Sequence, residues 1–264
     1  MAYETIDVVV DGPIATLTLN RPERLNAFDL RMSDEIVDAI GRVQSDAGLR
    51  VLIITGAGRA FCAGGDVRTP GEIGAERTPM EARDWLKRLG QRLPLALQQL
   101  EKPVIAAING VAAGGGLDLA CACDLRIASE TATFISVFAR IGLFPGTGGC
   151  WFLPRLVGIE RACELIWTGE SIGAHEALRI GLVGRVVPPE QLLPTARELA
   201  ARLARAAPLA VRLAKNAIYR GLQQDLATHL DWAATAETIT LTSEDHREGL
   251  AAQREKRPPL FRGR

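Results

Sequence analysis

Two glycine-rich turns in this chain have the residue types needed to stabilise a negatively charged oxygen. The first, FCAGGD, spans residues 61–66, and the second, NGVAAGGGLD, spans 109–118. Each follows an apolar run, at 51–55 and 104–108, that predicts a strand buried on both faces. Glycine allows a close approach of backbone to a ligand, and the first N–H groups of a helix lack intrahelical acceptors. We therefore predict that the N–H groups of Ala63 and Gly115 bind one carbonyl oxygen as it becomes an enolate or a tetrahedral oxyanion.

Asp118 is the titratable residue that accompanies these two donors. It lies three residues after Gly115, so on a helix its carboxylate shares a face with Gly115. A base one turn beyond an oxyanion donor suits removal of a proton next to a carbonyl group. An aspartate taken alone is more often a solvated or capping residue. Here the neighbours Leu117, Leu119 and Ala120 favour a buried carboxylate, so we take Asp118 as the candidate acid/base.

Other chemistries find less support in the sequence. Glycine turns after strands also occur in dinucleotide sites, but neither 56–61 nor 114–119 has the third glycine of GxGxxG, and neither offers GxxxxGK. His175, His229 and His246 fall in predicted helices without the spacing of a metal site or a catalytic triad. We predict packing or surface roles for these histidines.

Strands and helices alternate up to about residue 187, which predicts an α/β core that positions the two turns. We expect a hairpin at 6–10 and 14–19, and then a helix at about 33–44 that begins at Ser33. Residues 68–94, with a charged helix at 80–90, suit either a mobile flap over the site or a solvated surface insertion. Helices are predicted at 190–205, 208–220 and 226–242. We therefore divide the chain into a core at 1–187 and a helical region at 188–264.

Five segments, in this order, resemble the crotonase, or enoyl-CoA hydratase/isomerase, superfamily. They are LTLNRPERLNAF (17–28), VLIITGAGRAFCAGGDV (51–67), KPVIAAINGVAAGGGLDLACACDLRIAS (102–129), RIGLFPGTGGCWFLPRLVG (140–158) and SEDHREG (243–249). One such segment is a weak signal, whereas five in the right order and separation are strong. The resemblance covers residue 6 to about residue 261. It implies an α/β crotonase-like spiral of stacked ββα units with a C-terminal helical oligomerisation region, assembled as a homotrimer or homohexamer.

The resemblance also implies an acyl-CoA thioester substrate, with coenzyme A as part of the substrate and no separate cofactor. Ala63 and Gly115 would bind the thioester oxygen. Asp118 falls on the first of two acidic positions, where the family's hydratases usually carry glutamate. Phe138 falls on the second, where a hydratase again carries glutamate, and Gly146 falls where some isomerases and a dehalogenase carry aspartate. Two of the three positions for a catalytic carboxylate are therefore empty.

The remaining residues that the resemblance implies would line the groove for CoA and the substrate. They are Arg24, Leu25, Ala60, Cys62, Gly64, Gly65, Asp66, Val67, Gly114, Phe138 and Arg140. Asp66, near a predicted helix start, and Asp124, at a helix-to-strand junction, are also expected to have structural roles. Arg140 would face CoA, an acidic substrate tail or a subunit interface.

The empty carboxylate positions shape the expected reaction. Hydration of an enoyl thioester needs a water that is held and deprotonated while the α-carbon is protonated, which the family's hydratases do with two carboxylates. A 1,3 proton shift needs one base, and decarboxylation or retro-aldol cleavage depends mainly on the oxyanion hole. We therefore expect an isomerase or lyase. The alternatives are a specialised hydratase in which Asp118 works without a second glutamate, and a catalytically silent acyl-CoA-binding or scaffold protein.

Composition limits the partners. The 264 residues contain 31 Lys and Arg against 31 Asp and Glu, so no global field favours nucleic acid or an anionic membrane. The N-terminal residues are acidic rather than signal-like, and no apolar run approaches about 18 residues. The five cysteines include no pair of CxxC motifs, which indicates reduced thiols rather than disulfides or zinc ligands. We expect a soluble, cytoplasmic protein without a metal.

Overall fold

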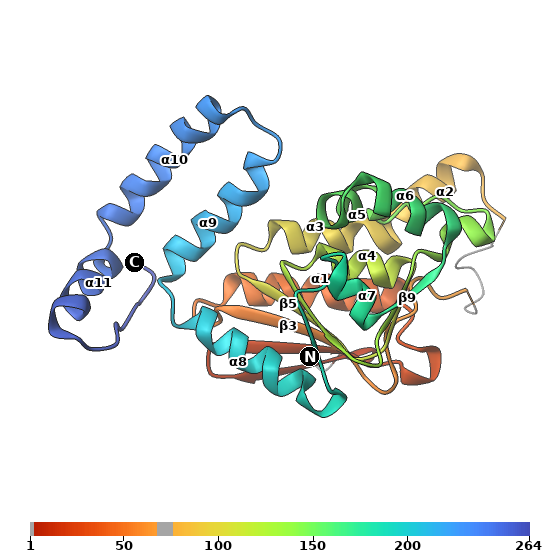
Figure 1. Ribbon diagram of the computed structural model, residues 1–264, viewed down its shortest axis with the longest axis horizontal. Coiled ribbons are helices and arrows are strands. Elements are labelled where there is room, and N and C mark those ends of the chain that lie inside the picture. The colour runs from red at the N-terminus through yellow and green to blue at the C-terminus, as the bar shows by residue number, and fades with distance from the viewer. Residues whose placement is uncertain (1–2, 68–75) are drawn as a thin grey trace.

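A computed structural model of the chain describes residues 3–67 and 76–264 (Figure 1). The main sheet has six strands in the order β1-β2-β3-β5-β7-β10. The hairpin β1–β2 is antiparallel, as predicted, and the other neighbours pair in parallel. The strands are β1 (Ile6–Asp11), β2 (Ile14–Leu19), β3 (Val51–Gly56), β5 (Val104–Ile108), β7 (Leu125–Ser129) and β10 (Arg185–Val187).

A smaller sheet brings the two glycine-rich turns together. Its order is β4-β6-β8-β9, formed by β4 (Ala60–Cys62), β6 (Val111–Ala113), β8 (Thr133–Ile135) and β9 (Ser171–Gly173). The strands β4 and β6 are parallel neighbours. The carboxyl ends of parallel strands meet at one edge, and the first turn follows β4 while the second follows β6. The register of this sheet therefore places the two turns side by side.

Helices cover both faces of the main sheet, which explains the continuous apolar runs of its central strands. On β3, Leu52 and Ile54 pack in the same cluster as α1 residues, whereas Val51 and Ile53 pack against α8. The helices along the core are α1 (Leu30–Ser45), α2 (Pro79–Leu86), α3 (Arg92–Gln99), α4 (Gly115–Ala122), α5 (Gly149–Val157), α6 (Ile159–Thr168), α7 (Ala174–Arg179) and α8 (Leu192–Ala204). Short 3₁₀ turns lie at Pro22–Arg24, Val137–Ile141 and Pro189–Gln191, and a π-helical turn at Lys87–Gln91 joins α2 to α3.

One local prediction needs correction, and it concerns the start of the first helix. The first helix begins at Leu30 rather than at Ser33, because the side chain of Asp29 accepts the N–H of Met32 and caps the helix. The Ser33 hydroxyl instead donates to the carbonyl oxygen of Leu89. The predicted charged helix at 80–90 is present as α2 and the π-helical turn. Residues 68–75 of the proposed flap lie outside the described residues.

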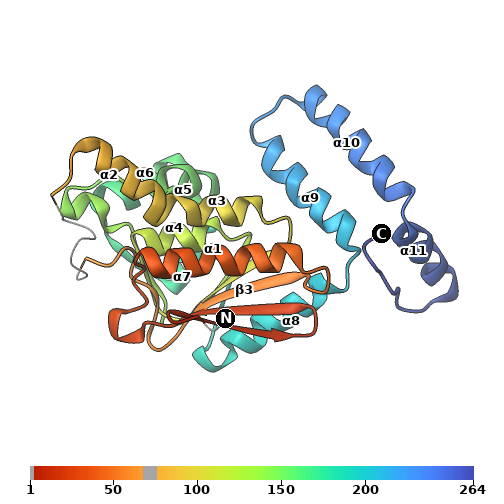
Figure 2. The same cartoon turned by 180° about the vertical axis from the view of Figure 1, so that it is seen from behind.

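The C-terminal helices α9 (Pro208–Gly221), α10 (Leu226–Leu241) and α11 (Glu244–Glu255) form an arm that extends away from the core, seen from both sides in Figures 1 and 2. The three helices confirm the helical character predicted for this region. The first helix after the predicted division at residue 188, α8, packs its alanines Ala196 and Ala200 on the main sheet. The arm that leaves the core begins at α9.

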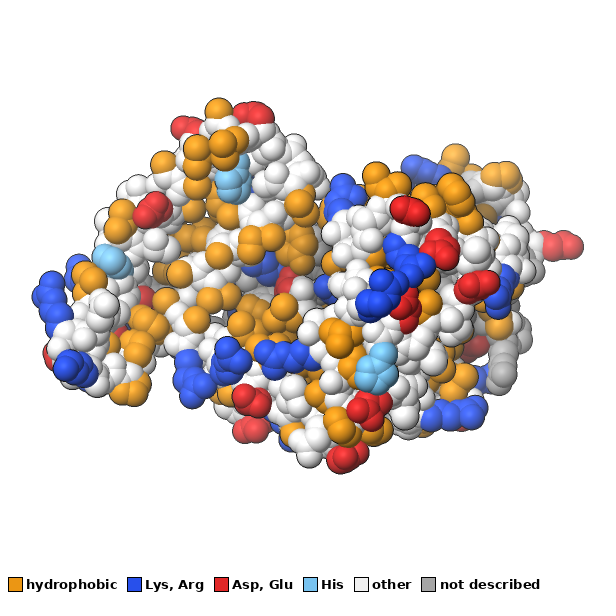
Figure 3. Space-filling model, in the orientation of Figure 1, with side chains coloured by type: hydrophobic (Ala, Val, Ile, Leu, Met, Phe, Trp, Pro, Cys, Tyr) orange, Lys and Arg blue, Asp and Glu red, His pale blue; other side chains and the backbone are white. Residues whose placement is uncertain are grey.

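Apolar side chains gather on the surface of this arm (Figure 3). Ile218, Leu222, Leu226 and Leu230 are each more than half exposed, which is unusual for a cluster of large aliphatic side chains. Within the described residues, no helix combines the length and apolarity needed to cross a bilayer.

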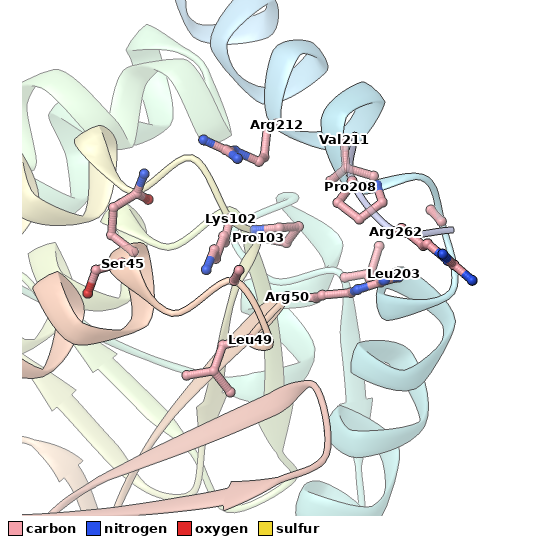
Figure 4. Close-up of a pocket in the computed structure, with 14 residues that line it drawn as sticks. Ser45, Leu49, Arg50, Lys102, Pro103, Leu203, Pro208, Val211, Arg212 and Arg262 are labelled. Atoms are coloured by element: carbon pink, nitrogen blue, oxygen red, sulfur yellow. The ribbon is translucent and has the colours of Figure 1, made fainter. Parts of the chain in front are cut away.

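Where the arm leaves the core, a cavity of about 170 Å³ contains several basic side chains (Figure 4). Arg50 donates to the carbonyl oxygens of Ala204 and Phe261, and Lys102 donates to those of Val43 and Asp46. Arg212 pairs with Glu101. These cations are held by contacts within the chain, so we assign them to the attachment of the arm rather than to a ligand.

Candidate active site

The two glycine-rich turns touch each other, and at two positions the contact requires glycine. Gly64 has φ of +94°, and a Cβ there would lie 2.9 Å from the carbonyl oxygen of Ala113. A Cβ on Gly116 would lie 2.1 Å from the carbonyl oxygen of Cys62. Any larger residue would force the turns apart. The close packing also brings the backbone nitrogen of Gly115, the first residue of α4, next to Gly64, since a Cβ built on Gly64 would lie 3.1 Å from it.

One of the two N–H groups predicted to bind the oxyanion is already hydrogen-bonded within the chain. The N–H of Ala63 donates to the carbonyl oxygen of Leu25 at 3.0 Å, so it is already engaged. Two residues later, Gly65 lies in an isolated parallel bridge with Phe28. The bonds of that bridge use the carbonyl of Gly64 and the N–H of Asp66, which leaves the N–H of Gly65 without an acceptor among the described residues. In this turn the unengaged N–H among the described residues is therefore that of Gly65 rather than that of Ala63.

Gly115 keeps its predicted place. As the first residue of α4, it has an N–H with no acceptor within the helix, and no backbone acceptor elsewhere in the described part of the chain binds it. Gly65 and Gly115 both line one cavity of about 320 Å³, which we call the central cavity. Two residues whose N–H groups have no acceptor among the described residues thus line one cavity.

Aromatic and aliphatic side chains form most of the wall of the central cavity. They are Phe28, Trp85, Leu86, Leu89, Phe138, Leu143 and Phe144. Arg77 lies at the cavity with its guanidinium over the ring of Trp85, 4.6 Å from the ring centre. Phe138 and Gly146, the two positions predicted to lack a catalytic carboxylate, both line the cavity. None of the described residues that line it is an aspartate or a glutamate.

Asp118 lies behind the cavity wall, 1% exposed. Its carboxylate accepts a hydrogen bond from the hydroxyl of Thr147 and another from the backbone N–H of Gly149 at the start of α5. Burial raises the pKa of Asp118 to about 6, although the two hydrogen bonds act in the opposite direction. The structure therefore places the predicted acid/base where its proton affinity suits proton transfer near neutral pH.

Thr147 is the site residue that the sequence analysis missed. It lines the central cavity and donates to Asp118, and the two residues lie 29 positions apart in the chain. The signal available in the sequence was a single hydroxyl among the glycines of FPGTGG at 144–149. Nothing in the local pattern shows that this hydroxyl meets the carboxylate of α4.

The other predicted groove residues have mixed placements. Leu25 follows the turn at Pro22–Arg24 and contacts the first glycine turn through its carbonyl. Asp66 is buried and pairs with Arg21 at 2.9 Å, which agrees with its structural role. No helix follows it within the described residues up to Val67. Cys62 is buried, and burial raises the pKa of its thiol to about 12, so the thiol is unreactive.

Arg140 lies apart from the central cavity. Its Nε donates to the carbonyl oxygen of Thr168 at 3.2 Å, near the end of α6. The bond leaves the side chain exposed, so a contact of Arg140 with CoA, an acidic substrate tail or a neighbouring subunit stays a prediction. All five cysteines are free thiols.

Comparison with known proteins agrees with this architecture. The family model described as enoyl-CoA hydratase/isomerase matches residues 10–264. The chain is 42% identical to a crotonyl-CoA hydratase of Syntrophomonas wolfei, over 99% of each chain. It is 39% identical to a 1,2-epoxyphenylacetyl-CoA isomerase of Escherichia coli, over 97% of each chain.

Among solved structures, the crystal structure of an enoyl-CoA hydratase from Bacillus anthracis superposes with a TM-score of 0.92 at 39% identity. The match covers 99% of this chain and 100% of the other. The parallel sheets, the paired glycine turns and these matches together show that the chain belongs to the enoyl-CoA hydratase/isomerase family of the crotonase superfamily.

Proposed function

We propose that the chain converts an acyl-CoA thioester through an enolate whose oxygen is bound by the N–H groups of Gly65 and Gly115. The observation that carries this proposal is the pair of N–H groups at the central cavity that find no acceptor among residues 3–67 and 76–264, with the buried carboxylate of Asp118 behind the cavity wall. Donors fixed by the fold stabilise charge that develops in the transition state without having to reorganise.

Asp118 is the single acid/base in this proposal. Because Phe138 and Gly146 leave the other carboxylate positions apolar, the site suits reactions in which one group removes a proton and returns it to another carbon. We therefore favour an isomerase, or a lyase that depends on the enolate, over an efficient hydratase with two glutamates. Coenzyme A enters as part of the substrate, and no other cofactor is needed.

A specialised hydratase is the second candidate. It is supported by the similarity to the crotonyl-CoA hydratase of Syntrophomonas wolfei and to a short-chain-enoyl-CoA hydratase of Clostridium acetobutylicum, each 42% identical. In that case Asp118 both activates the water and returns its proton to the α-carbon. A catalytically silent acyl-CoA-binding protein is less well supported, because burying a carboxylate with a raised pKa has no benefit for binding alone.

We also propose that the arm joins neighbouring subunits in a homotrimer or homohexamer, since contact with another subunit would remove its exposed aliphatic side chains from water. A cytoplasmic location stays a prediction from the sequence.

A panel of thioesters tests the function. The protein is incubated in deuterated water with enoyl-CoAs of both double-bond positions and with β-keto and malonyl thioesters, and the products are followed by mass spectrometry. We expect isomerisation or cleavage, with deuterium entering at the α- or γ-carbon. In Asp118→Asn this exchange should fall at least ~10²-fold. Asp245→Asn, which alters a buried carboxylate in the arm, serves as the control. Binding of CoA thioesters without any turnover or exchange would favour the silent protein.

A further inference from the structure

The carboxylate of Asp118 does not reach the central cavity by itself. It is 1% exposed and absent from the cavity wall, whereas Thr147 belongs to that wall. The carboxylate is held from behind by α5, because a Cβ on Gly149 would lie 2.6 Å from Oδ1. Its other oxygen, Oδ2, accepts the hydroxyl of Thr147. Among the hydrogen bonds that the described residues make, the one through Thr147 is therefore the route by which a proton can pass between Asp118 and the cavity.

The hydroxyl of Thr147 also lies next to the proposed oxyanion donor. A Cβ built on Gly115 would be 3.5 Å from Thr147 Oγ1. A thioester oxygen bound by the N–H of Gly115 places the adjacent α-carbon in the same part of the cavity. The hydroxyl thus lies between the central cavity and the carboxylate, in hydrogen-bond contact with the latter.

We propose that Thr147 is a proton relay through which Asp118 exchanges a proton with the substrate in the central cavity. The inference rests on the proposed enolate chemistry and names a further residue for it. In the forward step, Thr147 Oγ1 accepts the proton that leaves the substrate side, either from the acyl chain or from the water that adds to it. At the same time, its own proton passes to Asp118 Oδ2.

The protons and electrons balance within the site. When a C–H bond breaks, its electron pair becomes the enolate, whose oxygen is held by Gly65 and Gly115. When water adds, its hydroxide forms the new C–O bond at the β-carbon, and the electron pair of the double bond becomes a β-hydroxy enolate whose oxygen is held in the same way. In both cases the proton stored on Asp118 returns through Thr147 to a carbon of the enolate, so that the carboxylate and the hydroxyl regain their starting state.

The relay also explains how an aspartate can act in a position behind the wall. Aspartate is one methylene shorter than glutamate, and the hydroxyl of Thr147 occupies the intervening space. The opposing interpretation is that Thr147 only supports Asp118 by satisfying one carboxylate oxygen. The two interpretations predict different kinetics.

The first test compares Thr147→Val with Thr147→Ser. The relay predicts that valine lowers kcat by at least ~10²-fold with KM nearly unchanged, whereas serine, which keeps the hydroxyl, stays within about 10-fold of the wild type. Thr55→Val is the matched control, because Thr55 is a buried threonine whose hydroxyl binds the carbonyl oxygen of Ala107 away from the cavity. A valine variant with kcat near that of the wild type would overturn the relay.

The pH profile separates the relay from mere support. Loss of a hydrogen bond to the carboxylate raises the pKa of Asp118, so a supporting role predicts that Thr147→Val shifts the acidic limb upward and recovers full activity at high pH. The relay predicts that kcat stays low at every pH, including those at which Asp118 is ionised. Recovery at high pH would contradict the relay.

A swap variant keeps the proposal testable if valine prevents folding. Asp118→Glu combined with Thr147→Ala lengthens the carboxylate by one methylene into the space that the hydroxyl leaves. We expect the double variant to recover at least ~10-fold of the kcat lost in Thr147→Ala alone. A double variant no better than Thr147→Ala would count against the relay. Failure of the proposed function itself looks different, because the wild type would then show no exchange or turnover with any thioester.

Discussion

At the residue scale, the burial that makes the carboxylate of Asp118 a base near neutral pH also lowers the stability of the folded protein. Burial in the folded protein raises the pKa of Asp118 to about 6 from its ordinary value of 3.8. The ionised form is the proton acceptor, so catalysis needs the form that burial disfavours.

The first prediction concerns pH and rate. Asp118 must be ionised to accept a proton, so kcat/KM should fall as the pH drops through about 6 and should level off above it. A pH–rate profile of the wild-type protein, with a slowly reacting thioester, measures this limb. A rate that is flat between pH 5 and pH 8 would exclude Asp118 as the base.

The second prediction concerns pH and stability. Between about pH 4 and pH 6 the folded protein binds more protons at Asp118 than the unfolded chain does. The free energy of unfolding therefore falls as the pH rises through this range. Above pH 6 the buried carboxylate lowers it by an amount on the order of 3 kcal/mol. Asp118→Asn removes that cost. Urea unfolding should therefore show a gain for Asp118→Asn at pH 8 that shrinks towards pH 4, and an equal gain at both pH values would contradict the assignment.

The third prediction distinguishes Gly65 from Ala63 as the donor. Replacing one peptide N–H by an ester oxygen removes the donor with little change in shape. At Gly65 this should lower kcat by about 10²–10³-fold, because the hydrogen bond strengthens as the oxyanion forms. At Ala63 the same change removes only the bond to Leu25, so it should weaken folding more than turnover. The reverse pattern would restore Ala63 as the donor.

At the element scale, Asp124 joins the core to the arm. Its Oδ2 accepts the N–H of Val104 and the ammonium of Lys215, and its Oδ1 accepts the hydroxyl of Tyr219. Lys215 on α9 is buried, and the carboxylate of Asp124 is the counter-charge it contacts. The structural role predicted for Asp124 is thus present, and it includes a helix that the sequence did not connect with it.

The fourth prediction is that Asp124→Asn destabilises the protein by about 3 kcal/mol, since it leaves a buried ammonium without its counter-charge. Denaturant unfolding measures the change. Glu176→Gln, which removes the surface pairs with Arg161 and Arg179, is the control and should shift the midpoint only slightly. Equal effects of the two variants would mean that the pair with Lys215 does not anchor α9.

At the scale of the whole molecule, the arm exposes aliphatic side chains that a monomer would leave in water. The fifth prediction is that Leu230→Asp reduces the size of the assembly measured by sedimentation, because the charge would be buried against a neighbouring subunit. Val9→Asp, on the exposed surface of β1, is the control. A monomeric wild type, or an unchanged assembly in Leu230→Asp, would contradict the proposed role of the arm.

Local patterns in the sequence determined where most of the strands, helices and glycine-rich turns of this protein lie. Continuous apolar runs marked β3 and β5, alternation marked the β1–β2 hairpin, and alanine- and leucine-rich segments marked α8 to α10. Glycine clusters located both turns, and apolar neighbours of Asp118 indicated its burial. These features depend on side-chain periodicity and turn chemistry within a few residues, which a single sequence carries.

Only the tertiary structure decided which groups meet. The N–H of Ala63 donates to Leu25, whereas that of Gly65 has no acceptor in the described part of the chain, because pairing with residues 25–28 sets which amides along the turn are bonded there. Thr147 reaches Asp118 because α5 packs on α4, and α8 joins the core because alternate side chains of β3 face it. Such contacts join residues far apart in the chain, and their register depends on packing and strand pairing rather than on local preference.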